Sequence, residues 1–150
     1  MKSIALKEFK IIGVAVRTSN QNGQSEIDVC SLWSRFIEDA LMEQIPNKES
    51  ADVYSVYSDY ESDQSYTTTI GCKVSSFEGL PEGFVGKTIP ASKYELYLST
   101  GKLPDCVVKT WTKIWASPIE RSFIADFDIY GAQAQRPEDA RVETYVSIIT

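Results

Sequence analysis

The fold of this chain follows from the stretch Ser25-Glu-Ile-Asp-Val-Cys-Ser-Leu-Trp-Ser-Arg-Phe-Ile-Glu-Asp-Ala-Leu41. Its apolar residues recur at helical spacing and form one continuous stripe, which predicts an amphipathic helix. Ser25 and Asp28 form a Ser-x-x-Asp version of the capping box, in which the Ser hydroxyl accepts a hydrogen bond from a free backbone N–H of the first turn. Pro46 stops the helix, because proline cannot continue the helical hydrogen-bond pattern.

Strands are predicted on both sides of this helix. Residues 8–17 are rich in Ile, Val and Phe, and a polar loop separates them from the helix. Residues 51–60 and 66–76 are rich in β-branched residues and tyrosine, and the short polar segment between them predicts a hairpin. The first half of the chain is therefore expected to run strand, helix, strand, strand.

The second half repeats that order. Residues 84–99 are extended, a second helix begins at Pro104 and ends at Pro118, and residues 121–130 and 140–149 form a closing pair of strands. This duplication predicts an α+β fold. Two β-α-β-β units would form an antiparallel-rich sheet of about eight strands, with both helices on one face and a central cleft where the halves meet.

The 150 residues are expected to form a single domain, 1–150, with pseudo-repeats at about 8–76 and 84–149. Residues 78–83, rich in glycine and proline, are the best candidate for the joint between the halves. We expect an internal connection there, because each half alone is too small to bury much of a core.

The composition excludes several function classes. The net charge is −6, which argues against direct nucleic-acid binding through a basic face. The chain has no histidine, which removes the Ser-His-Asp triad, the Cys-His pair and most zinc sites, so we predict neither a metal nor a cofactor. The three widely spaced cysteines are expected to be buried small hydrophobes in a reduced cytoplasm. Neither a signal peptide nor a membrane span is expected.

The last predicted strand, residues 140–149, carries a single acid, Glu143. Glu143 alternates with Arg141, Tyr145 and Ser147 along one face of this strand. From alternation alone, a solvated outer face with Arg141 beside Glu143 is the default interpretation. The opposite face carries Val142, Thr144 and Val146.

Six segments, spread in order over nearly the whole chain, resemble a known family. The resemblance is to the effector-binding domain family, which includes the GyrI-like proteins, the C-terminal domain of Rob-type AraC regulators and the drug-binding domain of BmrR-type multidrug regulators. It is nearest to the stand-alone versions associated with integron gene cassettes. The segments are Val53-Tyr-Ser-Val-Tyr-Ser-Asp-Tyr-Glu-Ser-Asp63, Tyr66-Thr-Thr-Thr-Ile-Gly-Cys72, Tyr94-Glu-Leu-Tyr-Leu-Ser-Thr-Gly101, Val107-Val-Lys-Thr-Trp-Thr-Lys-Ile-Trp115, Phe127-Asp-Ile-Tyr130 and Val142-Glu-Thr-Tyr-Val146.

The resemblance implies a site for lipophilic cations. In the family an acid of the last strand reaches into an aromatic-lined cleft, and by the Val-Glu-x-Tyr pattern that acid is Glu143. The family's Phe-Glu-x-Tyr motif appears here with a shortened acid, as Phe127-Asp-Ile-Tyr130. On helix stripes such aromatic residues more often belong to the core. The aromatic candidates for the cleft are Trp33, Phe36, Tyr57, Tyr94, Trp111 and Tyr145.

Three functions follow as hypotheses. The first is binding of a small cationic or amphiphilic molecule, as a drug sink or sensor, with Glu143 balancing the charge. The second is a small hydrolase of reactive electrophiles, with Glu143 as base toward water. The third is an acidic protein-interaction modulator of the gyrase-inhibitor type. A second copy of the chain or a separate regulator protein are candidate partners, and no transcriptional role is carried over because no DNA-binding domain accompanies the resemblance.

Overall fold

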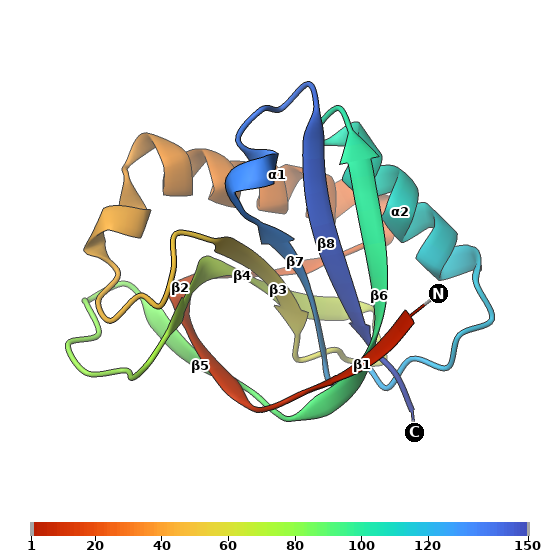
Figure 1. Ribbon diagram of the computed structural model, residues 1–150, viewed down its shortest axis with the longest axis horizontal. Coiled ribbons are helices and arrows are strands. Elements are labelled where there is room, and N and C mark those ends of the chain that lie inside the picture. Colours follow the sequence, from red (N-terminus) through yellow and green to blue (C-terminus); the bar gives the residue numbers. More distant parts are fainter. Residues whose placement is uncertain (1, 150) are drawn as a thin grey trace.

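The computed structural model describes residues 2–149 and shows one curled antiparallel sheet covered by two helices (Figure 1). The helices are α1 (Gln24–Glu38) and α2 (Asp105–Ala116), and three single-turn 3₁₀ helices are η1 (Gln21–Gly23), η2 (Leu41–Gln44) and η3 (Ala132–Ala134). The strands are β1 (Lys2–Leu6), β2 (Phe9–Ser19), β3 (Val53–Ser58), β4 (Ser65–Val74), β5 (Val85–Ile89), β6 (Ser92–Gly101), β7 (Ala125–Tyr130) and β8 (Ala140–Ser147).

The strand order confirms the predicted duplication. It runs β1-β6-β8-β7-β3-β4-β2-β5, so β6-β8-β7 of the second half mirrors β2-β4-β3 of the first across the β7–β3 seam. At that seam Val56 lies opposite Phe127. The leading strand of each half pairs with the other half, because β1 extends β6 and β5 extends β2. This exchange ties the two units into one sheet.

The sheet curls away from the helices (Figure 1). Phe9 of β2 contacts the ring of Phe127 of β7, 5.3 Å between centroids, although three strand boundaries separate β2 from β7 in the sheet. A close approach of β2 and β4 assists the curl: Gly13 lies opposite Gly71, and a Cβ on Gly13 would meet a β4 carbonyl oxygen at 2.2 Å. The inner face holds a half-aromatic, half-aliphatic core of Ile11, Tyr54, Val56, Ile89, Tyr94, Ala125, Phe127 and Tyr145.

Both helices pack on the outer face, as predicted. Leu32 and Phe36 of α1 join a buried cluster with Ile12 and Ile70 of the sheet. Val107, Trp111 and Ile114 of α2 join a second cluster with residues of β8. Burying a side chain of this size stabilises the fold by about 1.5–3 kcal/mol, so each stripe holds its helix in place. Within residues 2–149, no helix has both the length and the apolar character needed to span a membrane.

Three local predictions are wrong. The capping box at Ser25 and Asp28 does not form: the N-cap is left-handed Gly23, two residues before Ser25, and no side chain caps the helix. The helix ends at Glu38 rather than near Pro46, because Ala40 has φ +50° and breaks the helical path. Of the three cysteines only Cys72 and Cys106 are buried, while Cys30 is exposed on α1.

Candidate functional site

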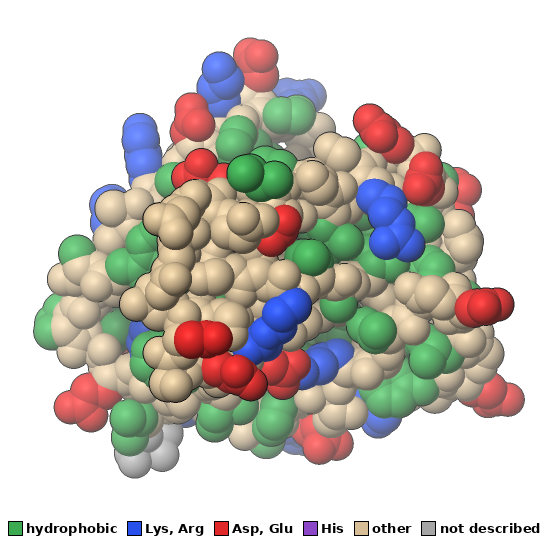
Figure 2. Space-filling model, turned by 180° about the vertical axis from the view of Figure 1, so that it is seen from behind, with side chains coloured by type: hydrophobic (Ala, Val, Ile, Leu, Met, Phe, Trp, Pro, Cys, Tyr) green, Lys and Arg blue, Asp and Glu red, His purple; other side chains and the backbone are tan. Residues whose placement is uncertain are grey.

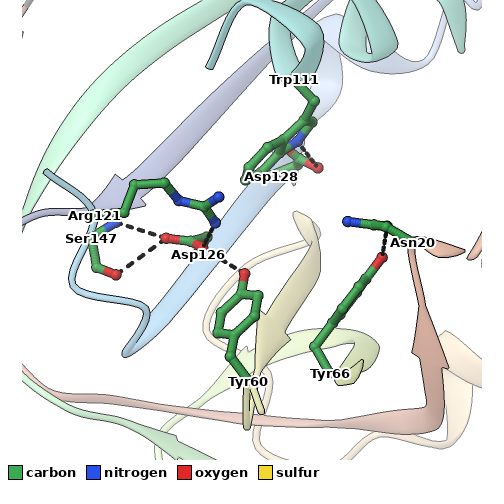
Figure 3. Close-up of polar contacts among 8 residues, drawn as sticks. All are labelled: Asn20, Tyr60, Tyr66, Trp111, Arg121, Asp126, Asp128 and Ser147. Carbon is green, nitrogen blue, oxygen red and sulfur yellow. Dashed lines mark hydrogen bonds and ion pairs between the residues drawn. The ribbon is translucent and has the colours of Figure 1, made fainter. Parts of the chain in front are cut away.

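The outer face of the sheet contains a fully buried acid, Asp128 of β7. Its carboxylate accepts hydrogen bonds from the Thr144 hydroxyl at 2.5 Å, from the Tyr57 hydroxyl at 2.7 Å and from Trp111 Nε1 at 3.2 Å. Figure 3 shows the indole of Trp111 reaching down from α2 onto this carboxylate. Three different elements therefore supply donors to one acid.

The surroundings set the charge of Asp128. Burial raises the pKa of its carboxyl to about 6, and the neighbouring charge of Asp126 adds to the rise, while the donors from Thr144, Tyr57 and Trp111 lower the pKa. Burial also raises the pKa of Tyr57 well above its usual value, so that phenol stays a neutral donor. Near neutral pH the Asp128 carboxylate is mostly ionised, and it takes part in none of the three ion pairs found within residues 2–149.

Aromatic residues from both helices and three strands lie on the same side of the sheet as this acid, and two of them, Tyr57 and Trp111, donate to it. Tyr57 meets Trp111 edge to face, with centroids 5.5 Å apart, and meets Tyr66 of β4 at 6.1 Å. Trp33 of α1 meets Tyr130 of β7 in the same manner at 4.9 Å. Trp33 thus reaches the sheet from α1, and Trp111 reaches it from α2. We call this set, Trp33, Tyr57, Tyr66, Trp111 and Tyr130, the aromatic cluster.

A second buried acid, Asp126, lies two residues before Asp128 on the same face of β7. It forms an ion pair with Arg121 at 2.7 Å and accepts hydrogen bonds from the Tyr60 hydroxyl at 2.5 Å and from the Ser147 backbone N–H at 2.8 Å (Figure 3). The two acids therefore differ in kind. Asp126 has a cation as partner, and Asp128 has only neutral donors.

The structure brings together three of the residues predicted from the sequence. Trp33, Tyr57 and Trp111 belong to the aromatic cluster near Asp128. Phe36, one turn along α1, is buried in the core beneath that helix and meets Trp33 edge to face at 6.3 Å. None of these four lies on the same face of the sheet as Glu143.

Glu143, Tyr94 and Tyr145 lie on the inner face of the sheet, away from both helices. Tyr145 stacks on Phe127 with centroids 4.9 Å apart, and its hydroxyl donates to Glu143 Oε1 at 3.2 Å. Tyr94 packs in the same inner core. The predicted parity of the last strand is confirmed, since Val142 and Val146 pack under α2. The predicted carboxylate and the predicted tryptophans are consequently on opposite faces.

Several residues of this site were absent from the sequence-based candidates: Tyr60, Tyr66, Arg121, Asp126, Asp128, Tyr130 and Thr144. One signal for Asp128 was present, because the motif Phe127-Asp-Ile-Tyr130 places an acid between two aromatic residues. Nothing local distinguishes Arg121 or Thr144. Thr144 meets Asp128 from the neighbouring strand β8, and Arg121 reaches Asp126 from the segment just before β7.

Side chains fill the region over Asp128, whose exposed fraction is 0%. A cavity of about 490 Å³ lies between the end of β6 and the loop before β8, and one of about 220 Å³ opens on the inner face beside Phe9, Tyr54 and Tyr145. Neither is lined by Asp128. Among the described residues, no group of three or more His, Cys, Asp or Glu side chains is placed to hold a metal ion. Acidic and basic side chains are interspersed over the face shown in Figure 2.

Comparisons with known proteins agree with this architecture. A family model described as integron-associated effector binding protein matches residues 4–148. YobU of Bacillus subtilis (strain 168), described as a candidate transcriptional regulator protein, is 31% identical over 95% of this chain and 92% of its own length. The chain belongs to the integron-associated effector-binding family.

Solved structures also share the fold, including the two that follow. The integron cassette protein VCH_CASS2 of Vibrio cholerae superposes with a TM-score of 0.75 at 25% identity, covering 99% of this chain and 95% of that one. SAV2435, solved bound to tetraphenylphosphonium, superposes with a TM-score of 0.83 at 13% identity, covering 99% and 93%.

Proposed function

We propose that this member of the effector-binding family binds a lipophilic organic cation over Asp128, within the aromatic cluster. The observation that carries the proposal is an acid with no exposed surface that contacts the paired rings of Tyr57 and Trp111 and has no cationic partner among the described residues. A buried carboxylate without a counter-charge is costly, and burial is the main reason that its pKa rises. A ligand cation removes that cost, so charge is selected with few shape-specific contacts.

The gain from such a cation is large enough to matter. A unit charge about 6 Å from Asp128, at an effective dielectric constant of about 20, contributes about 3 kcal/mol, or roughly a hundredfold in affinity. Each aromatic face beneath the cation adds about 0.5–2 kcal/mol. The fold neighbour bound to tetraphenylphosphonium supports this ligand class, since that molecule combines a single positive charge with four aromatic rings.

Entry of the ligand requires the cluster to open. Asp128 is sealed by Trp111 from α2, and Trp33 closes the neighbouring part from α1. Each tryptophan covers its part of the sheet with one indole ring. Rotation of that ring, or a small shift of its helix, would make room for a ligand. Trp33 remains partly exposed, which places it at the edge of the site.

The test is calorimetric titration of the full chain with tetraphenylphosphonium at pH 7.5. We expect Asp128→Asn to weaken binding by roughly a hundredfold, and the neutral triphenylphosphine oxide to bind much less well than the cation. Glu143→Gln is the matched control, because it removes one carboxylate from the inner face of the same sheet. Equal binding of the cation and the neutral compound would refute the proposal.

The same titration decides between the two acids. If Glu143→Gln weakens binding and Asp128→Asn does not, Glu143 is the acid that balances the ligand charge, as the family resemblance implied, and the site belongs on the inner face. The hydrolase and the interaction-modulator hypotheses stay predictions, as do the proposed protein partners.

A further inference from the structure

Arg121 occupies a position that resembles the one proposed for the ligand. Its guanidinium carbon lies 4.3 Å from the ring centroid of Phe123, 5.5 Å from that of Trp111 and 5.8 Å from that of Tyr60. The side chain is only 13% exposed and is paired with Asp126, which is fully buried. A cation is therefore already held by aromatic faces and a carboxylate, and Trp111 is shared with Asp128.

This ion pair differs from the other two that the structure describes. Lys87–Asp59 and Arg17–Glu61 join partners that are 24–68% exposed, and such pairs lie at the surface, where water screens them. The Arg121–Asp126 pair lies on the same sheet face as Asp128, and Trp111 touches both groups. Arg121 is thus a single positive charge beside two buried acids, Asp126 and Asp128.

The hold on Arg121 is incomplete. A guanidinium has five N–H donors, and the side-chain hydrogen bond described for Arg121 is the one from Nη2 to Asp126. Its Nε is buried and has no hydrogen-bond partner within residues 2–149. The backbone, by contrast, is anchored. Arg121 forms a β-bridge with Ile148, and the Ser122 backbone N–H donates to the Ser147 carbonyl at 3.0 Å. The side chain can therefore leave while the main chain stays in place.

We propose that Arg121 is a tethered competitor, a resident cation that leaves its aromatic contacts when a ligand cation enters. This inference rests on the proposed function and deepens it. A cationic ligand replaces the positive charge that Arg121 withdraws from Asp126, so one cation stays beside the two buried acids before and after binding. A neutral ligand would displace the guanidinium and leave Asp126 unpaired, which makes Arg121 a determinant of the preference for cations.

The first test compares two variants that each remove one positive charge. Arg121→Met retains the aliphatic stem and removes the competitor, so we expect it to bind tetraphenylphosphonium about tenfold more tightly than the unmodified chain. Lys87→Met removes the charge of the exposed pair on β5, at the far edge of the sheet, and we expect less than about a twofold change. Binding by Arg121→Met that is unchanged, or weaker, overturns the inference.

The second test needs no variant, which matters if Arg121→Met fails to fold. Because three aromatic rings lie 4.3–5.8 Å from its guanidinium carbon, we expect the Nε–Hε resonance of Arg121 to be ring-shifted in the spectrum of the unliganded, ¹⁵N-labelled protein. Saturation with tetraphenylphosphonium should move that resonance to the position of an exposed arginine. A resonance that keeps its ring-shifted position at saturation would show that the guanidinium stays. If the cation binds through Asp128 but Arg121 does not move, this inference alone falls; if the cation does not bind, both proposals fall.

Discussion

The sharpest prediction concerns how binding of a permanent cation depends on pH through Asp128. Burial raises the pKa of this carboxyl from 3.8 to about 6 in the unliganded protein. A bound cation favours the ionised form, so affinity should fall as pH falls through about 6. Tetraphenylphosphonium itself does not titrate, and the chain contains no histidine, so few other groups change charge between pH 5 and 7.

The magnitude follows from the ionised fraction. With a pKa of about 6, roughly 9% of Asp128 is ionised at pH 5 and roughly 91% at pH 7, which gives an affinity about tenfold higher at pH 7. The free energy of unfolding depends on pH in the opposite direction from the affinity. Because the folded state binds the Asp128 proton more tightly than the unfolded state does, that stabilisation is present at low pH and is lost as pH rises through 6. The loss is about 1 kcal/mol between pH 5 and 7.

The assay is calorimetric titration at half-unit steps from pH 5 to 7.5 at constant ionic strength. Glu143→Gln should reproduce the profile of the unmodified chain, and Asp128→Asn should bind weakly with no slope. A flat profile for the unmodified chain, or a slope that survives in Asp128→Asn, would refute the assignment of the charge to Asp128. A slope that disappears only in Glu143→Gln would move the site to the inner face.

Three further predictions test the site and the fold. Trp111→Phe keeps a ring but removes the N–H donor that lowers the pKa of Asp128. The midpoint of the profile of affinity against pH should therefore move upward in the same titrations. A downward shift would contradict the described hydrogen bond. Gly13→Ala would place a methyl group 2.2 Å from a β4 carbonyl oxygen and should lower the free energy of unfolding by more than about 2 kcal/mol in urea titration; a near-normal midpoint would mean that the strands separate easily. Leu32→Ala should lower the free energy of unfolding by about 2–5 kcal/mol. Ile37→Ala, at a side chain that is 68% exposed on the same helix, should lower it by less than about 0.5 kcal/mol. Equal losses would mean that α1 packs through another face.

Local periodicity was enough to predict most of the order of elements, although β1 (Lys2–Leu6) was not expected. The apolar stripe of α1 and that of α2 are visible as helical spacing, and the alternation in β3 and β4 marks a hairpin, so the duplicated α+β architecture followed. Helix ends were less predictable. The capping box at Ser25 has the right residue types, yet left-handed Gly23 precedes the helix and no side-chain cap forms. Capping depends on the backbone path that leads into the helix, and the residue types around Ser25 do not specify that path.

The acid of the site shows the same limit more clearly. Alternation correctly separated Glu143 from Val142 and Val146, because successive side chains of a strand point to opposite faces. It could not tell which of those faces the helices cover. The acid near Trp111 is consequently Asp128, on the strand beside β8.

By itself, the sequence determined what is periodic and near in the chain: two amphipathic helices, most of the strands, the two faces of the last strand and the absence of histidine chemistry. Only the tertiary structure decided which side chains meet around the buried acids: Tyr57 from across the β7–β3 seam, Thr144 and Trp111 from β8 and α2, and Arg121 held against Asp126. The reason is physical. Alternation repeats every two residues within a strand, whereas burial of a charge depends on which helix and which neighbouring strands close over it.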